Sequence, residues 1–110
     1  MSSRKPFVLD VKNGSEYQQL LDGSPQTHGM RSGRVFLKPG EDCGQHSTGA
    51  HEEMLVFLTG SGLALIGDND QLEVAAGKIS YIPPHTDHNV KNNGSGPLVY
   101  IYCVAPVNAQ

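Results

Sequence analysis

Short hydrophobic runs, each interrupted by glycine, proline or small polar residues, follow one another along most of this chain. Runs of this length that are rich in β-branched and aromatic residues, and are bounded by turn-forming residues, are typical of β-strands. The pattern predicts strands at residues 33–38, 44–48, 51–59, 63–66, 72–75, 79–82, 88–91 and 98–104. Short strands at such regular spacing indicate an all-β sandwich or barrel.

Two polar clusters mark the clearest turns between these strands. Residues 67–70 read Gly-Asp-Asn-Asp, a set that tolerates left-handed backbone conformations, and they predict a hairpin between the strands on either side. Residues 92–96 form a second turn before the final apolar run.

The region before the first predicted strand favours one short helix. Ser15 and Gln18 have the spacing of a capping box, while Tyr17, Leu20 and Leu21 recur at helical intervals and Gly23 follows. Residues 1–10 are polar apart from positions 7–9, and they suit either an extra edge strand or a segment that pairs with a second subunit. We interpret residues 1–30 as an extension of a barrel at 33–105, within one domain that spans 1–110.

Composition limits the possible functions more than it suggests one. A chain of 110 residues builds a single domain. Its net charge of −3 and its lack of a basic run give no electrostatic support for binding nucleic acid or an anionic membrane. It has no apolar stretch of the roughly 20 residues that span a bilayer, and no signal-peptide pattern at its start. We therefore expect a cytoplasmic protein that interacts with a small molecule.

Three histidines and one glutamate carry the chemistry. Side chains on a strand alternate between faces, so His51 and Glu53 share a face, with His46 on the strand before and His88 further along. Imidazole and carboxylate ligands suit iron, manganese, nickel, zinc or copper, and two histidines with one carboxylate form the facial triad of non-haem iron oxygenases. The pattern predicts a metal site inside the barrel.

The spacing of these residues resembles the two motifs of the cupin superfamily. The first motif is glycine, five residues, histidine, one residue, histidine, four residues, glutamate, six residues and glycine. The second motif is glycine, five residues, proline, one residue, glycine, two residues, histidine, three residues and asparagine. The matching positions are Gly40, His46, Glu53 and Gly60 in the first motif, and Gly77, Pro83, His88 and Asn92 in the second.

This resemblance implies a jelly-roll β-barrel, usually a homodimer, with one divalent metal such as iron, manganese, nickel or zinc. His85 stands where the second motif usually has glycine, and Thr48 replaces the second histidine of the first motif. Threonine is a poor ligand for these metals. Two alternatives remain: His46, Glu53 and His88 form a three-ligand site, or His51 supplies a fourth ligand from the face that it shares with Glu53.

Other residues are candidates for contact with the substrate. Thr48 and Phe57 have the parity of the predicted ligands on their strands, and Tyr100 lies on the last strand. Arg34 alternates with Val35, so one of the two faces the interior. If it is Arg34, its guanidinium can bind a substrate carboxylate in a bidentate manner.

These observations favour a small metal-dependent cupin enzyme that acts on a small polar or anionic molecule. The reaction classes implied by the resemblance are dioxygenase-like, decarboxylase- or lyase-like, and isomerase-like. The alternative is a cupin that binds a sugar or a small acid without converting it. A third hypothesis, a metal-free remnant, follows from the substitution at Thr48.

Overall fold

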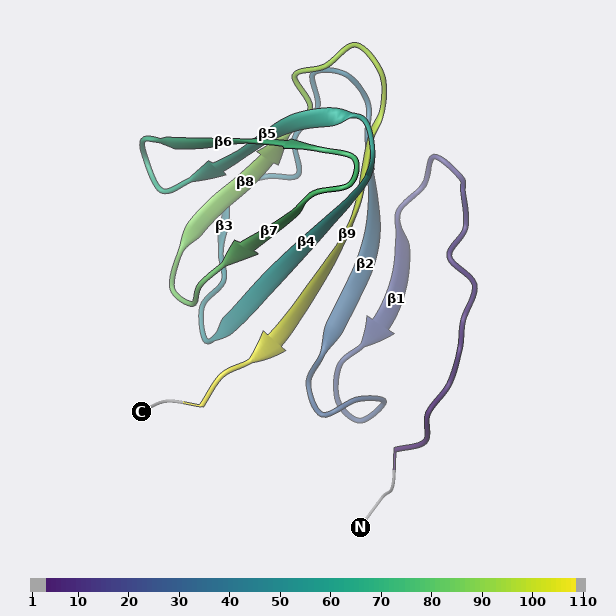
Figure 1. The fold of residues 1–110 in the computed structure, drawn as a ribbon. Helices are drawn as coiled ribbons and strands as arrows, with labels where there is room; N and C mark the ends of the chain where they lie inside the picture. The colour runs from purple at the N-terminus through teal and green to yellow at the C-terminus, as the bar shows by residue number, and fades with distance from the viewer. Residues whose placement is uncertain (1–3, 109–110) are drawn as a thin grey trace.

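The computed structural model describes residues 4–108, which form an all-β barrel of two facing sheets (Figure 1). Its strands are β1 (Gln18–Asp22), β2 (Arg31–Leu37), β3 (His46–Ser47), β4 (His51–Thr59), β5 (Ser61–Ile66), β6 (Asp70–Ala75), β7 (Ile79–Ile82), β8 (Asp87–Lys91) and β9 (Leu98–Pro106). Within this part of the chain there is no helix that could cross a membrane.

The two sheets differ in size and enclose the core between them. One sheet has the order β1-β2-β9-β4-β7 and the other has the order β3-β8-β5-β6, with antiparallel pairing throughout. Alternate residues of each strand point inward, as the period of two requires. The buried core cluster consists of Leu37, Leu55, Phe57, Ala64, Val74, Ile82, Val90, Leu98 and Tyr100. The predicted all-β barrel is therefore confirmed.

The predicted N-terminal helix is wrong. The segment that contains Leu20 and Leu21 is strand β1, which pairs with β2 at the edge of the five-stranded sheet. A helix of about seven residues is marginal in isolation. Pairing with β2 satisfies the backbone groups of this segment and buries Leu20, so tertiary contacts outweigh the local helical pattern.

Asn92 holds together the loop between β8 and β9. Its side chain is fully buried, and Nδ2 donates hydrogen bonds to the carbonyl oxygens of Leu37 (2.9 Å) and Gly96 (2.8 Å). Its Oδ1 accepts a hydrogen bond from the Gly94 N–H at 2.9 Å. These hydrogen bonds to the backbone fix the end of β8 and the loop that follows it.

The turn between β7 and β8 contains the one non-glycine residue with positive φ among the described residues. His85 has φ of 55°, in the left-handed region where glycine carries no steric cost. This is the position at which the second cupin motif usually has glycine. The backbone at this position therefore has a conformation that glycine adopts without steric cost, although the residue is histidine.

We expect Asn92→Ala to destabilise the fold by about 2–4 kcal/mol, because it removes three hydrogen bonds and leaves buried carbonyl groups without a donor. Urea unfolding followed by circular dichroism measures this loss. Asn93→Ala, at the exposed neighbouring position, is the matched control and should change stability by less than about 0.5 kcal/mol. Equal effects of the two substitutions would contradict the assignment.

Candidate metal centre

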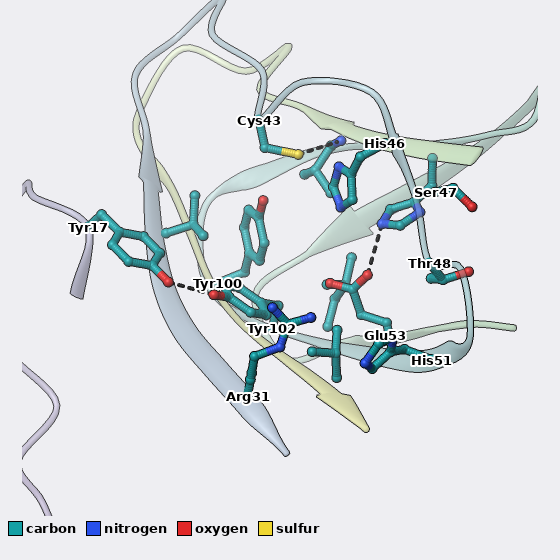
Figure 2. Close-up of a pocket in the computed structure, with 15 residues that line it drawn as sticks. Tyr17, Arg31, Cys43, His46, Ser47, Thr48, His51, Glu53, Tyr100 and Tyr102 are labelled. Atoms are coloured by element: carbon teal, nitrogen blue, oxygen red, sulfur yellow. Dashed lines mark hydrogen bonds and ion pairs between the residues drawn. The ribbon is translucent and has the colours of Figure 1, made fainter. Parts of the chain in front are cut away.

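Strands from both sheets bring His46, Glu53 and His88 together (Figure 2). His46 and His88 are directly paired in the register of β3 and β8, and their rings lie 4.2 Å apart between centroids. Glu53 reaches them from β4 in the facing sheet. One ligand atom from each residue lies within 4.8 Å of the others. The structure thus places three of the four predicted ligands at one point.

Backbone carbonyl groups orient both imidazole rings. His46 Nδ1 lies 2.9 Å from the Gly44 carbonyl oxygen, and His88 Nδ1 lies 3.1 Å from the Thr86 carbonyl oxygen. Because a carbonyl oxygen only accepts hydrogen bonds, each Nδ1 carries the proton. When such a ring is neutral, its Nε2 therefore presents a lone pair. Such outer hydrogen bonds are typical of histidines that bind metals.

The Nε2 atom of His88 is buried and lies 2.9 Å from Glu53 Oε1. This distance allows an ion pair when His88 is protonated, and Nε2 has no hydrogen-bond partner of acceptable geometry within the described residues. Burial lowers the pKa of His88, but interactions with Glu53, with the Thr86 carbonyl and with Asp87 outweigh it and raise the pKa above 6.5. A buried nitrogen without a directed partner, facing a buried carboxylate, fits a divalent cation held by both groups.

Thr48 has a structural role instead of a ligand role. Its hydroxyl donates a hydrogen bond to the Pro83 carbonyl oxygen at 2.7 Å and accepts one from the Thr86 N–H at 3.0 Å. These bonds tie the turn between β3 and β4 to the loop between β7 and β8. Thr48 still lines the cavity, but both hydrogen bonds engage its hydroxyl oxygen with the backbone.

His51 lies on the same cavity wall without joining the ligand cluster. It begins β4 two residues before Glu53 and is half-buried, yet it lies outside the group formed by His46, Glu53 and His88. The geometry therefore favours a site with three protein ligands.

The cluster opens into a cavity of about 450 Å³ inside the barrel. The other polar side chains on its wall are those of Tyr17, Arg31, Cys43, Tyr100 and Tyr102, together with Ser47, Thr48 and His51. Its apolar lining consists of Val35, Leu55, Val90 and Val104. Burial, together with Cys43, raises the pKa of Tyr100, so this phenol stays protonated at neutral pH.

Two of the predicted substrate-binding residues lie elsewhere. Arg34 is buried on the other face of β2, where Nη1 donates a hydrogen bond to the Gly14 carbonyl oxygen at 2.8 Å. Phe57 is part of the core and packs against Tyr100, with 5.4 Å between ring centroids. Neither lines the cavity.

Sequence reasoning missed the cation that does line the cavity, Arg31. The predicted strand began at residue 33, whereas β2 begins at Arg31. Arg31 shares the inward face of β2 with Val35. Strand parity would have identified it if the predicted strand had begun two residues earlier. Tyr17 was missed because it was predicted to lie in a helix, whereas it directly precedes β1 and lines the cavity.

The fold is a barrel of two facing sheets, and its interior holds a His-Glu-His cluster that could bind a metal ion. Residues 33–104 match the sequence profile of the Cupin domain family, and the chain belongs to this family. An uncharacterized protein of Methanocaldococcus jannaschii is 33% identical over 103 residues, which cover 93% of this chain and 80% of that protein.

Solved structures share the fold. An RmlC-like cupin family protein from Methanocaldococcus jannaschii has a TM-score of 0.78 at 19% identity, over 92% of this chain and 91% of that chain. A predicted oxalate decarboxylase from Thermotoga maritima has a TM-score of 0.76 at 21% identity, over 83% of this chain and 79% of that chain. At these identities the likeness concerns the double-stranded β-helix fold alone.

Substitution of the clustered histidines should separate ligands from neighbours. We expect His46→Ala and His88→Ala each to abolish stoichiometric metal binding, because each removes one of three protein ligands. His51→Ala should lower metal affinity by less than about tenfold. Elemental analysis of purified variants and titration with Mn²⁺ or Zn²⁺ measure both effects. Loss of metal in His51→Ala equal to that in His46→Ala would show a four-ligand site.

Metal affinity should fall as the pH drops through neutrality. Metal binding requires a neutral imidazole, and the pKa of His88 is raised above 6.5, so protons compete with the metal at a higher pH than at an ordinary histidine. We expect affinity to fall by about tenfold or more from pH 8 to pH 6, measured by calorimetric titration. An affinity that stays constant over this range would contradict the assignment of His88 as a ligand.

Proposed function

We propose that this cupin is a metal-dependent enzyme that acts on a small carboxylic acid. One observation carries the proposal: the His46, Glu53 and His88 cluster and the guanidinium of Arg31 line the same cavity. A cluster that suits a divalent metal, together with a cation, provides two separate points of attachment for a molecule with several oxygen atoms.

His46, Glu53 and His88 would hold the metal. A divalent metal bound there supplies Lewis-acid activation of a substrate oxygen or, if it is redox-active, activation of dioxygen. Three protein ligands leave coordination positions open to small molecules. The carbonyl groups of Gly44 and Thr86 keep both imidazoles in the tautomer that this role requires.

Arg31 supports an anionic substrate. Among residues 4–108 its guanidinium has neither an acidic partner nor a hydrogen-bond acceptor, and Figure 2 shows it directed into the cavity. A guanidinium presents paired N–H donors that match a carboxylate. An unpartnered cation on the wall of a cavity is therefore suited to bind the acid group of a substrate.

The apolar lining would strengthen these interactions. Val35, Leu55, Val90 and Val104 surround the space between the polar groups. A bound acid would displace water from this lining, and charges interact more strongly where the dielectric constant is low. The arrangement suits decarboxylase- or lyase-like and dioxygenase-like reactions of small acids, the former in keeping with the predicted oxalate decarboxylase that shares the fold.

The test combines metal loading with a panel of substrates. Protein loaded with Fe²⁺, Mn²⁺, Ni²⁺ or Zn²⁺ is incubated with small acids and phenols while oxygen uptake and carbon dioxide release are followed. Oxygen uptake would identify a dioxygenase-like reaction, and carbon dioxide release without oxygen a decarboxylase-like one. Binding of acids without turnover would instead favour the non-catalytic cupin, and failure to bind metal would overturn the proposal.

Arg31→Gln should raise KM for the acid by about tenfold to a hundredfold with a smaller change in kcat, because it removes a charge-assisted interaction made in both the ground state and the transition state. Arg31→Lys should recover part of the loss. Lys78→Gln removes an exposed charge outside the cavity and is the matched control. If Arg31→Gln and Lys78→Gln behave alike, Arg31 does not bind the acid.

A further inference from the structure

We infer that Tyr17 is a specificity-determining residue, which closes one side of the cavity and limits the length of the acid that it admits. The inference rests on the proposed function, because it takes the cavity to be the substrate site. It goes beyond that function because Tyr17 lies outside both cupin motifs and before the matched domain. Its role follows only from how the segment before β1 packs.

Tyr17 reaches the inner face of the barrel from the sheet edge. In the β1–β2 register Gln18 pairs with Arg34 and Gln19 pairs with Gly33, so Tyr17 continues the strand beside Val35, a cavity residue. Its side chain is 52% exposed and also lines the cavity. Tyr17 therefore lies at the boundary between the cavity and the surrounding water.

The Tyr17 ring packs closely against Tyr102 and Gly33. It stacks against Tyr102 with 6.4 Å between centroids and an interplanar angle of 18°. Gly33 lies beneath the pair, and a Cβ atom there would collide with the Tyr17 hydroxyl and lie 2.7 Å from Tyr102 Cε2. The absence of a side chain at position 33 is thus what allows both rings to occupy this side of the cavity.

A chain of hydrogen bonds fixes the positions of the Tyr17 and Tyr102 hydroxyl groups. The side-chain amide of Gln19 donates to the Leu21 carbonyl, so its Oε1 is left to accept from the Tyr17 hydroxyl at 2.8 Å. The Tyr17 oxygen then accepts from the Tyr102 hydroxyl at 2.5 Å. Both phenolic protons are used within the protein. Tyr17 therefore acts on a ligand through its bulk, and Arg31 remains the donor for the anion.

Arg34 is the positioning residue for this wall. Its buried guanidinium donates to the Gly14 carbonyl oxygen, three residues before Tyr17. The backbone of Lys12 and Asp10 is held in turn by the side chain of Gln18. These contacts hold the segment that precedes Tyr17 against β1 and β2. They give Arg34 a connection to the cavity although its side chain lies on the other face of β2.

The test measures binding of a chain-length series to Zn²⁺-loaded protein. The probes are oxalate, malonate, succinate, glutarate and adipate, titrated calorimetrically. The unsubstituted protein should lose affinity beyond a definite length. Tyr17→Ala should shift that limit and improve the affinity for the longest diacids, relative to the shortest, by about fivefold or more. Tyr17→Phe keeps the ring and should stay within about threefold of the unsubstituted profile.

Variants of Arg34 test whether it positions Tyr17, and a Tyr81 variant serves as the control. Arg34→Met should broaden the profile as Tyr17→Ala does, whereas Arg34→Lys, which keeps a donor for Gly14, should restore it. Tyr81→Ala is the matched control, because Tyr81 is exposed and bonded to Glu52 away from the cavity. Thermal unfolding confirms that each variant is folded.

The possible outcomes separate this inference from the proposed function. Zn²⁺ content is measured first, and its absence from the unsubstituted protein contradicts the proposed function. Normal Zn²⁺ content with the same length profile in Tyr17→Ala and Tyr81→Ala overturns the assignment of Tyr17. Failure of every diacid to bind the Zn²⁺-loaded protein contradicts both, because the proposed function itself requires the cavity to bind an acid. A profile that Tyr17→Phe broadens as much as Tyr17→Ala would replace the steric role by a role of the hydroxyl.

Discussion

The buried ion pair between Glu53 and His88 is the interaction on which the site depends. Glu53 belongs to the five-stranded sheet and His88 to the four-stranded sheet, so the 2.9 Å approach of their side chains joins the two walls of the barrel. Desolvation makes such a pair costly, and removal of one partner leaves a buried charge that destabilises by several kcal/mol. This destabilising pair lies at the point where a bound cation would interact favourably with both groups. The burial of these two polar groups therefore explains both the free-energy cost of the pair and its suitability for a metal.

The cavity is chemically asymmetric. Its metal-type cluster comes from β3, β4 and β8, whereas Arg31, Tyr102 and Tyr17 come from β2, β9 and the segment before β1. The first set belongs to the strands that carry the two cupin motifs. The second set lies outside those motifs, and two of its members, Tyr17 and Tyr102, pack against Gly33. Under the proposed function, the cluster would hold the metal and the opposite side of the cavity would distinguish substrates.

Much of the cluster could be predicted because motif spacing and strand parity agree. His46, Glu53 and His88 stand at motif positions, and the structure brings them within 4.8 Å. The missing histidine at position 48 was also visible in the sequence. What Thr48 does instead was not visible, because its bonds to Pro83 and Thr86 connect loops that are far apart in the chain. The exclusion of His51 from the cluster likewise depends on the path of β4, since His51 and Glu53 have the same parity.

The sequence by itself determined the all-β architecture and the cluster of chemical residues, because short apolar runs, turn residues and motif spacing are local properties. Tertiary structure alone decided the N-terminal segment, where pairing with β2 turned an apparent helix into a strand. It also decided which arginine faces the cavity. Arg31 and Arg34 have opposite parity on β2, and only the packing of the sheet against its partner fixes which face is inside. Alternation along a strand defines two faces, but burial chooses between them.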